Sequence, residues 1–150
     1  MKTVKKRKTG QVVVEMLLIL PVFLTIVFTV MEMGYLAYWV IVLNHATYEC
    51  ARIGSMLATP LTGGEPAAVD LAMQNFMHRM ISGAAIAGSI ESTLPDPQAG
   101  TLNHDLVATA SFNVPLIFPT SYFILAKPPG SGRRLITATV RLPIERPLPR

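Results

Sequence analysis

The feature that most constrains the fold is a 20-residue apolar run from Val12 to Met31, near the start of the chain. At about 1.5 Å per residue, a helix of this length is about 30 Å long, which matches the hydrocarbon core of a bilayer. The run therefore predicts a membrane-spanning helix over residues 12–31. It contains one carboxylate, Glu15, close to its start. An acid inside a membrane segment is costly, so it indicates a function in recognition or assembly.

The basic charge of the chain is concentrated ahead of this run. The sequence has 13 Lys and Arg against nine Asp and Glu, a net charge of +4. Five basic residues and no acidic ones precede Gly10: Lys2, Lys5, Lys6, Arg7 and Lys8. The remaining eight basic and nine acidic residues give a net charge of −1, so we expect no nucleic-acid partner. Basic residues beside a membrane segment stay in the cytoplasm, which predicts a cytoplasmic N-terminus and an external C-terminal part.

These features predict three parts in a chain of 150 residues, a length that suits one folded domain. Residues 1–10 would be a basic leader peptide that is cleaved off. Residues 11–59 would form a long N-terminal helix that includes the membrane span. Residues 60–150 would form an external α+β domain.

The first helix is predicted to continue beyond the membrane to about Ala58. Small and apolar residues recur there at steps of three and four, the pattern of an amphipathic helix. This stripe consists of Leu36, Trp39, Val40, Leu43, Ala46, Thr47, Cys50, Ile53, Gly54 and Leu57. Polar residues such as Glu32 fall mostly off the stripe. We expect Tyr35, Tyr38 and Trp39 to form an aromatic belt at the membrane surface.

The second half of the chain changes its periodicity. A second helix is predicted from Pro66 to about Ser82, and alternating apolar residues predict strands over 86–93, 106–118 and 135–145. A long crossing loop with an apolar centre, residues 119–134, connects the last two strands. The expected fold class is α+β, with an antiparallel sheet of three or four strands packed on the outer half of the first helix.

Gly10 and the residues that follow it, Gln11-Val-Val-Val-Glu15, resemble the recognition site of a prepilin peptidase. Such sites have basic residues, a glycine, the cut, and glutamate at the fifth mature position. The resemblance implies cleavage between Gly10 and Gln11. The new α-ammonium group of Gln11 would then pair with Glu15 of its own or a neighbouring chain. A buried carboxylate whose charge is paired only when neighbouring chains are correctly offset sets the register of an assembly.

Three downstream segments resemble TadE-like proteins, which are minor pilins (pseudopilins) of the tight-adherence, or Tad/Flp, branch of the type IV pilus systems. They are Val30-Met-Glu32-Met-Gly34-Tyr-Leu-Ala-Tyr38, Leu43-Asn-His-Ala46 and Glu49-Cys-Ala51-Arg52. The resemblance implies a pilin-like fold and a non-enzymatic function in the assembly, priming or tip of a Tad-type pilus or related secretion filament. It also implies a single-pass protein of the bacterial inner membrane. The implied partners are a prepilin peptidase, the major pilin, other minor pilins and an inner-membrane assembly platform.

Two further surfaces are candidates for contacts. Glu32 and Gly34 follow the membrane span and are predicted to lie at a helix–helix contact, because a missing side chain lets backbones approach. The second candidate is an apolar patch in the crossing loop, since exposed apolar patches usually mark binding surfaces. It consists of Tyr122, Phe123, Ile124 and Leu125.

We expect no catalytic residues, cofactor or metal site. His45, Glu49 and Arg52 lie within two helical turns, but a solvated, salt-bridged helix face explains them better than a catalytic or metal-binding group. Cys50 is the single cysteine, so it forms no intrachain disulfide and is predicted to be a packed core residue. Two alternatives stay open: a signal-anchored periplasmic binding module that is never cleaved, and the main subunit of a filament.

Overall fold

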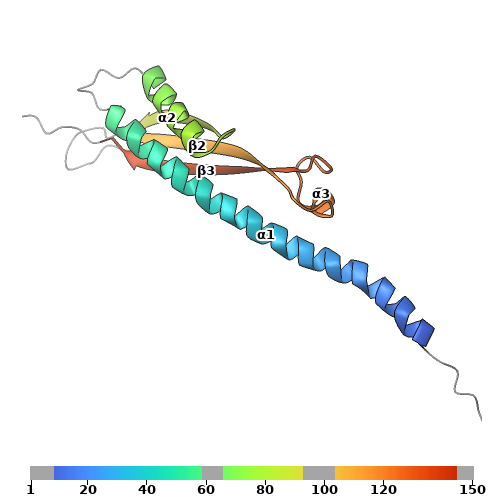
Figure 1. Ribbon diagram of the computed structural model, residues 1–150. Helices are drawn as coiled ribbons and strands as arrows, with labels where there is room; N and C mark the ends of the chain where they lie inside the picture. Colours follow the sequence, from blue (N-terminus) through green and yellow to red (C-terminus); the bar gives the residue numbers. More distant parts are fainter. Residues whose placement is uncertain (1–8, 59–65, 93–103, 145–150) are drawn as a thin grey trace, which may run out of the picture.

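A long helix runs through the whole molecule and is shared by its two halves. The computed structural model describes residues 9–58, 66–92 and 104–144. Helix α1 extends over Thr9–Leu57, and its 49 residues give a length of about 73 Å. Figure 1 shows its N-terminal half projecting from an α+β unit that packs along one side of its C-terminal half. We call this unit, made of the C-terminal half of α1 and everything after it, the outer domain.

The outer domain adds one helix, one sheet and one helical turn to α1. Its elements are α2 (Pro66–Met80), β1 (Ala85–Ser92), β2 (His104–Pro115), α3 (Ser121–Ile124) and β3 (Arg133–Pro143). The strands pair antiparallel in the order β1-β2-β3. This arrangement confirms the predicted α+β class, with three strands in the sheet.

The sheet has one buried and one exposed face. Along β2, Leu106, Ala108 and Ala110 are buried, whereas Thr109 between them is exposed. This alternation confirms the predicted period of two. On the exposed face, Arg141 forms ion pairs with Asp105 at 2.8 Å and with Glu91 at 3.1 Å.

Helices α1 and α2 both pack on the buried face of the sheet. Buried residues of all these elements form one core cluster, which includes Leu43, Ala46 and Cys50 from α1 and Met73 and Met77 from α2. The stripe that the sequence predicts in the outer half of α1 is therefore the side that faces the sheet. Its small residues let the sheet and α2 approach the helix closely.

Gly54 of α1 packs closely against the rest of the core. A Cβ atom at this position would lie 2.6 Å from Sδ of Met73 and 2.7 Å from Cδ2 of Leu106. A side chain therefore does not fit unless these neighbours move. Across the same core, Asp70 of α2 accepts a hydrogen bond from the backbone N–H of Gly88 at 2.7 Å, which fastens α2 to the edge strand β1.

In the N-terminal half of α1, two threonine hydroxyls have hydrogen-bond partners within the helix. The helix passes through Pro21, which has no N–H to donate. The hydroxyl of Thr25 donates to the carbonyl of Pro21 at 2.8 Å, and the hydroxyl of Thr29 donates to the carbonyl of Thr25 at 2.7 Å. The segment therefore exposes few unpaired polar groups to an apolar environment.

Observed element boundaries differ from the predicted ones by a few residues. The largest difference is at the end of β2, which stops at Pro115 although the alternation predicts a strand to residue 118. Residues 116–118 leave the sheet and approach α1. The leader, apart from Thr9 and Gly10, lies outside the described residues, so its removal stays a prediction.

Candidate functional site

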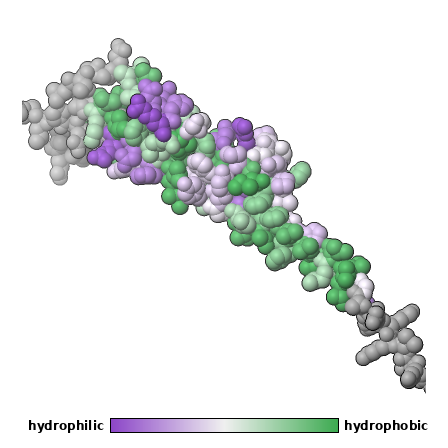
Figure 2. Space-filling view, in the orientation of Figure 1, coloured by the Kyte–Doolittle hydropathy of each residue, from purple (hydrophilic) through white to green (hydrophobic). Residues whose placement is uncertain are grey.

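The N-terminal half of α1 has no cover from its own chain. Every side chain from Gln11 to Leu24 is exposed, and Figure 2 shows hydrophobic residues gathered along this half of the helix. Helix α1 is long and apolar enough to cross a membrane: its most apolar 18-residue window has a mean hydropathy of 2.6 and is 0% buried. An apolar surface of this length requires lipid or other protein chains around it.

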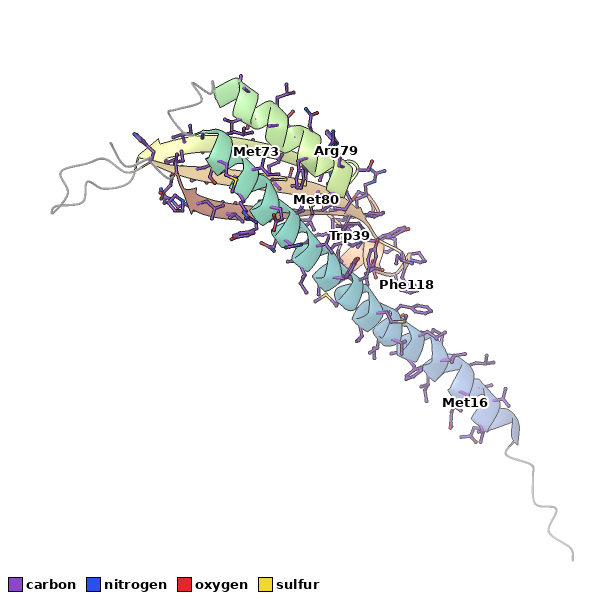
Figure 3. The ribbon with its side chains drawn as sticks, turned by 60° about the vertical axis from the view of Figure 1, so that its left-hand side comes forward. Met16, Trp39, Met73, Arg79, Met80 and Phe118 are labelled. Atoms are coloured by element: carbon purple, nitrogen blue, oxygen red, sulfur yellow. The ribbon has the colours of Figure 1, made fainter. Side chains whose placement is uncertain are left out.

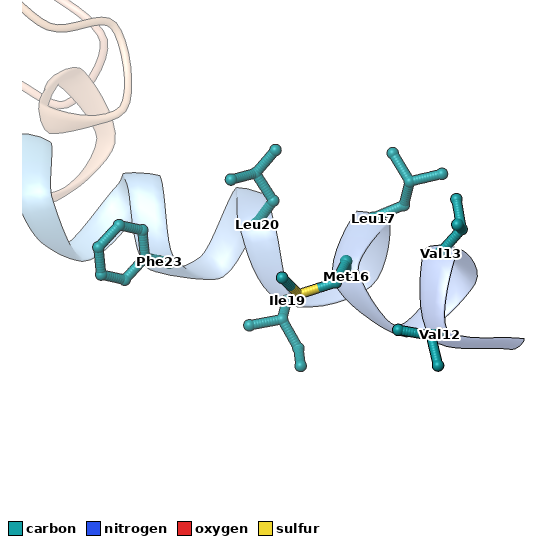
Figure 4. A pocket seen from close by; sticks show the side chains of 7 residues that line it. All are labelled: Val12, Val13, Met16, Leu17, Ile19, Leu20 and Phe23. Atoms are coloured by element: carbon teal, nitrogen blue, oxygen red, sulfur yellow. The ribbon is translucent and has the colours of Figure 1, made fainter. Parts of the chain in front are cut away.

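A hollow on this surface is lined by residues of α1 alone. Figure 4 shows seven apolar side chains between Val12 and Phe23 that project from successive turns of α1. No second element faces them among the residues that the structure describes. The hollow is therefore part of the lipid-facing or subunit-facing surface and not a pocket for a small ligand.

The predicted peptidase site lies at the start of α1. Gly10 and Gln11 lie in the first turn, and Gly10 has open space where a Cβ atom would be. The amide Nε2 of Gln11 donates to Oε1 of Glu15 at 3.2 Å, with both side chains exposed. Within the described part of the chain, no cation pairs with Glu15. Its carboxylate is thus available to a partner outside this chain.

Glu32 has a role that the sequence did not reveal. Its side chain is 0% exposed. The carboxylate accepts hydrogen bonds from the backbone N–H of Ile117, at 3.1 and 3.2 Å to its two oxygens, and from that of Phe118, at 3.0 Å. Hydrogen bonds to an ionised acceptor are stronger than those between neutral groups. The side chain therefore fastens the end of β2 to α1.

A ring contact also joins α1 to the segment after β2, one helical turn closer to the N-terminus of α1. The rings of Phe28 and Phe118 stack with centroids 4.7 Å apart and an interplanar angle of 7°. Phe28 and Glu32 are four residues apart and lie on the same side of α1. Figure 3 shows Phe118 beside the middle of the helix. Phe118 is thus held twice, by its N–H on Glu32 and by its ring on Phe28.

The segment between β2 and β3, residues 116–132, is a closed structure that we call the junction loop. The N–H of Leu116 donates to the carbonyl of Gly132 at 2.9 Å and closes its two ends. Gly132 has φ +64°, a conformation that favours glycine, and a Cβ atom there would lie 3.4 Å from the ring of Tyr122. The helical turn α3 lies within the loop.

The four residues of the predicted partner surface separate into two pairs. Phe123 and Ile124 are 80% and 63% exposed. Tyr122 and Leu125 are half-buried and hold the loop together: the Tyr122 hydroxyl donates to the carbonyl of Leu116 at 3.4 Å, and the carbonyl of Leu125 accepts from the Arg134 guanidinium at 3.0 Å. Of these four residues, only Phe123 and Ile124 present a large apolar surface to the outside.

The two residues predicted to lie at a helix–helix contact, Glu32 and Gly34, have different surroundings. The sequence places Glu32 off the buried stripe. Its side chain is nevertheless buried, because the junction loop of its own chain encloses it. Gly34 is exposed, and nothing lies within 4 Å of a Cβ atom built on it. A contact between Gly34 and a neighbouring helix stays a prediction. Among the glycines of α1, the one that permits close packing within the chain is Gly54.

Trp39, one of the three residues of the predicted aromatic belt, packs within the chain, and a place for the three at the membrane surface stays a prediction. Its ring packs against Phe112 of the sheet, with centroids 4.9 Å apart, and Tyr35 and Tyr38 contact it edge-on. The indole N–H is buried and has no hydrogen-bond partner among the described residues. Trp39 therefore belongs to the contact between α1 and the sheet, and Tyr38 is the largely exposed member of the three.

Cys50 is a free cysteine that lies in the core. Cys50 is fully buried, as predicted, and burial together with the nearby Glu49 carboxylate raises the pKa of its thiol to about 11. A thiol in this state is protonated and unreactive at neutral pH. Across residues 9–58, 66–92 and 104–144, no three His, Cys, Asp or Glu side chains are placed to hold a metal ion.

Comparison with known proteins found one similarity, in the N-terminal segment. Residues 10–52 match the family model described as TadE-like protein. The matched segment contains Gly10, Glu15, Phe28, Glu32 and Gly34, and it covers less than a third of the chain. Neither the curated proteins nor the solved structures gave a significant match.

Proposed function

From the TadE-like segment at residues 10–52, we propose that this protein is a minor pilin (pseudopilin) of a Tad-type pilus or related secretion filament. The observation that carries the proposal is helix α1. It is TadE-like in sequence, bare and apolar in its first half, and the core element of an α+β domain in its second half. Such a helix suits a bilayer before assembly and a bundle of packed helices after it.

In the proposed arrangement, α1 crosses the inner membrane once, with the N-terminus in the cytoplasm and the outer domain in the periplasm. The basic residues before Gly10 favour this orientation. The TadE-like pilin family is structural and non-enzymatic, in agreement with a function in assembly. The proposed partners are the peptidase, the major pilin, other minor pilins and the assembly platform.

Cleavage after Gly10 is part of the proposal. It would place a new α-ammonium group at Gln11, four residues before Glu15. The Glu15 carboxylate is exposed and is bonded only to the Gln11 side chain among the described residues. In lipid, an unpaired acid is unfavourable by about 3 kcal/mol. Pairing with the N-terminus of a neighbouring subunit removes this penalty, which favours the staggered assembly over the isolated protein.

The test is the N-terminal sequence and intact mass of the protein purified from membranes, from strains with and without the prepilin peptidase. We expect a start at Gln11 that depends on the peptidase. The Gly10→Ala variant should keep the full mass in both strains. A start at Met1 in both strains would contradict the proposal and favour a permanently anchored periplasmic binding module.

A further inference from the structure

We propose that the junction loop enters the periplasmic leaflet of the membrane that α1 crosses, with Phe123 and Ile124 as the inserted side chains. The protein would then contact the bilayer at two places, through α1 and through its outer domain. This inference rests on the proposed membrane location of α1. It adds a second, separate membrane contact, in which lipid covers the exposed apolar surface of the loop.

The contact between Phe28 and Phe118 places the start of the junction loop at a defined depth along α1. Phe28 lies three residues before Met31, the end of the expected span, and is therefore about 4.5 Å inside it. The ring of Phe118 stacks on Phe28 at 4.7 Å, so both rings lie at a similar level. When residues 12–31 cross the hydrocarbon core, the start of the junction loop is at its periplasmic edge.

The junction loop extends toward the N-terminal half of α1. Figure 1 shows α3 beside the middle of α1, farther toward the N-terminal half of the helix than the sheet is. In the same loop, Phe123 is 80% and Ile124 is 63% exposed. At the level of lipid headgroups and upper acyl chains, these side chains leave water for an apolar environment, which is favourable.

The backbone of the loop is suited to this environment. Irregular backbone near the hydrocarbon is tolerated only where its polar groups have partners. Glu32 accepts the N–H groups of Ile117 and Phe118. Further N–H groups are bonded within the loop, those of Leu116, Ser121, Tyr122, Leu125 and Gly130. The loop therefore presents apolar side chains on a backbone whose donors are largely satisfied internally.

The charge of the loop and its flanking residues is positive. The junction loop contains one basic side chain, Lys127, and β3 begins with two more, Arg133 and Arg134; residues 116–134 contain no acidic ones. Lys127 and Arg133 are exposed. A segment with exposed apolar residues and only positive charge is complementary to a leaflet that contains anionic lipids. This charge pattern favours lipid over an apolar protein groove as the occupant of the surface.

The experiment measures depth by fluorescence quenching in the full-length chain. Single cysteines are introduced by Phe123→Cys or Ile124→Cys and labelled with an environment-sensitive fluorophore. The protein is then placed in vesicles of phosphatidylethanolamine and phosphatidylglycerol with brominated acyl chains. Because Cys50 is fully buried, the label goes to the introduced cysteine, and the wild-type chain gives the background. Leu20→Cys, in the span, and Thr139→Cys, on the exposed face of the sheet, are the matched controls.

We expect brominated lipid to quench the labels at 123 and 124 nearly as strongly as the label at 20, and to leave the label at 139 unquenched. Quenching at 20 without quenching at 123 and 124 would overturn the inference but leave the membrane anchor intact. A label at 123 that is shielded from water but not quenched would overturn it in favour of a protein occupant, including a second copy of this chain. No quenching at 20 would contradict the proposed membrane location itself.

Discussion

At the scale of single residues, two carboxylates on one helix have opposite surroundings. Glu32 is enclosed and accepts backbone N–H groups of its own chain. Glu15 is exposed, and among the described residues only the side chain of Gln11 bonds to it. Glu32 therefore contributes to the fold of the single chain, whereas Glu15 is free to contribute to contacts between chains. Substitutions at the two positions should separate folding from assembly.

Glu32→Ala should destabilise the junction without removing the protein from the membrane. The substitution leaves the N–H groups of Ile117 and Phe118 without their acceptor, and each unsatisfied donor costs about 1–3 kcal/mol. Thermal unfolding in detergent should show a lower melting temperature, and hydrogen exchange at residues 117 and 118 should accelerate. Glu49→Ala removes another α1 carboxylate outside the junction and is the control. Unchanged exchange at both amides would contradict the role of Glu32.

Glu15→Ala should affect assembly but not membrane insertion. Removing the charge eliminates an unfavourable group from the apolar segment, so the variant should insert as well as the wild type or better. The number of pili per cell, counted by electron microscopy, should fall because the pairing with the Gln11 ammonium group is lost. Normal pilus numbers in a strain whose only copy is this variant would show that the pairing argument is incorrect.

At the scale of elements, α1 combines two kinds of helix in one. Its first half is apolar on all sides, as in a membrane span. Its second half has a narrow stripe of small and apolar residues, and the sheet and α2 pack on that stripe. Two glycines mark this difference. Gly54 lies against Met73 and Leu106, whereas Gly34 faces open space.

Gly54→Ala and Gly34→Ala form a matched pair. At Gly54 the new methyl group would overlap Met73 and Leu106, and overpacking of this kind costs about 1–3 kcal/mol. At Gly34 there is room, and alanine favours a helix over glycine by about 1 kcal/mol. Thermal unfolding in detergent should therefore show opposite shifts of the melting temperature. Equal shifts would contradict the close packing at Gly54. A loss of pili in Gly34→Ala alone would support a contact with a neighbouring helix.

At the scale of the whole molecule, the anchor and the outer domain are joined in two ways. One is the continuous α1, which belongs to both halves. The other is the junction loop, which returns from the sheet to contact α1 at Phe28 and Glu32. A second connection restricts bending of the helix between its two halves. The outer domain is therefore held in a defined orientation relative to the apolar segment.

Leu43→Asp should unfold the outer domain while the anchor remains in the membrane. Leu43 is 1% exposed in the centre of the core, where an unpaired carboxylate is strongly unfavourable. Limited proteolysis of membrane fractions should digest the outer domain and leave a membrane-bound N-terminal fragment. Ile41→Asp, at a position that is 69% exposed, is the control and should stay resistant. Resistance of both variants would argue against a continuous packed helix.

The sequence by itself determined the features that depend on local periodicity. The apolar run of residues 12–31, the stripe that continues it, the second helix and the alternation of β2 and β3 are all patterns of neighbours along the chain. The same holds for the TadE-like resemblance, which lies within residues 10–52. Cys50 was correctly predicted as a core residue because it belongs to the stripe.

Only the tertiary structure decided which residues meet at the junction. Glu32 is 85 residues from Ile117 in sequence, and no local pattern indicates that two backbone N–H groups leave the sheet to bond its carboxylate. The same return of the chain turns Tyr122 inward and Phe123 outward, although both lie in one apolar run. Burial of a polar side chain depends on partners that folding brings together from distant segments. For this reason, the sequence predicted an acid outside the apolar stripe where the structure has a buried one.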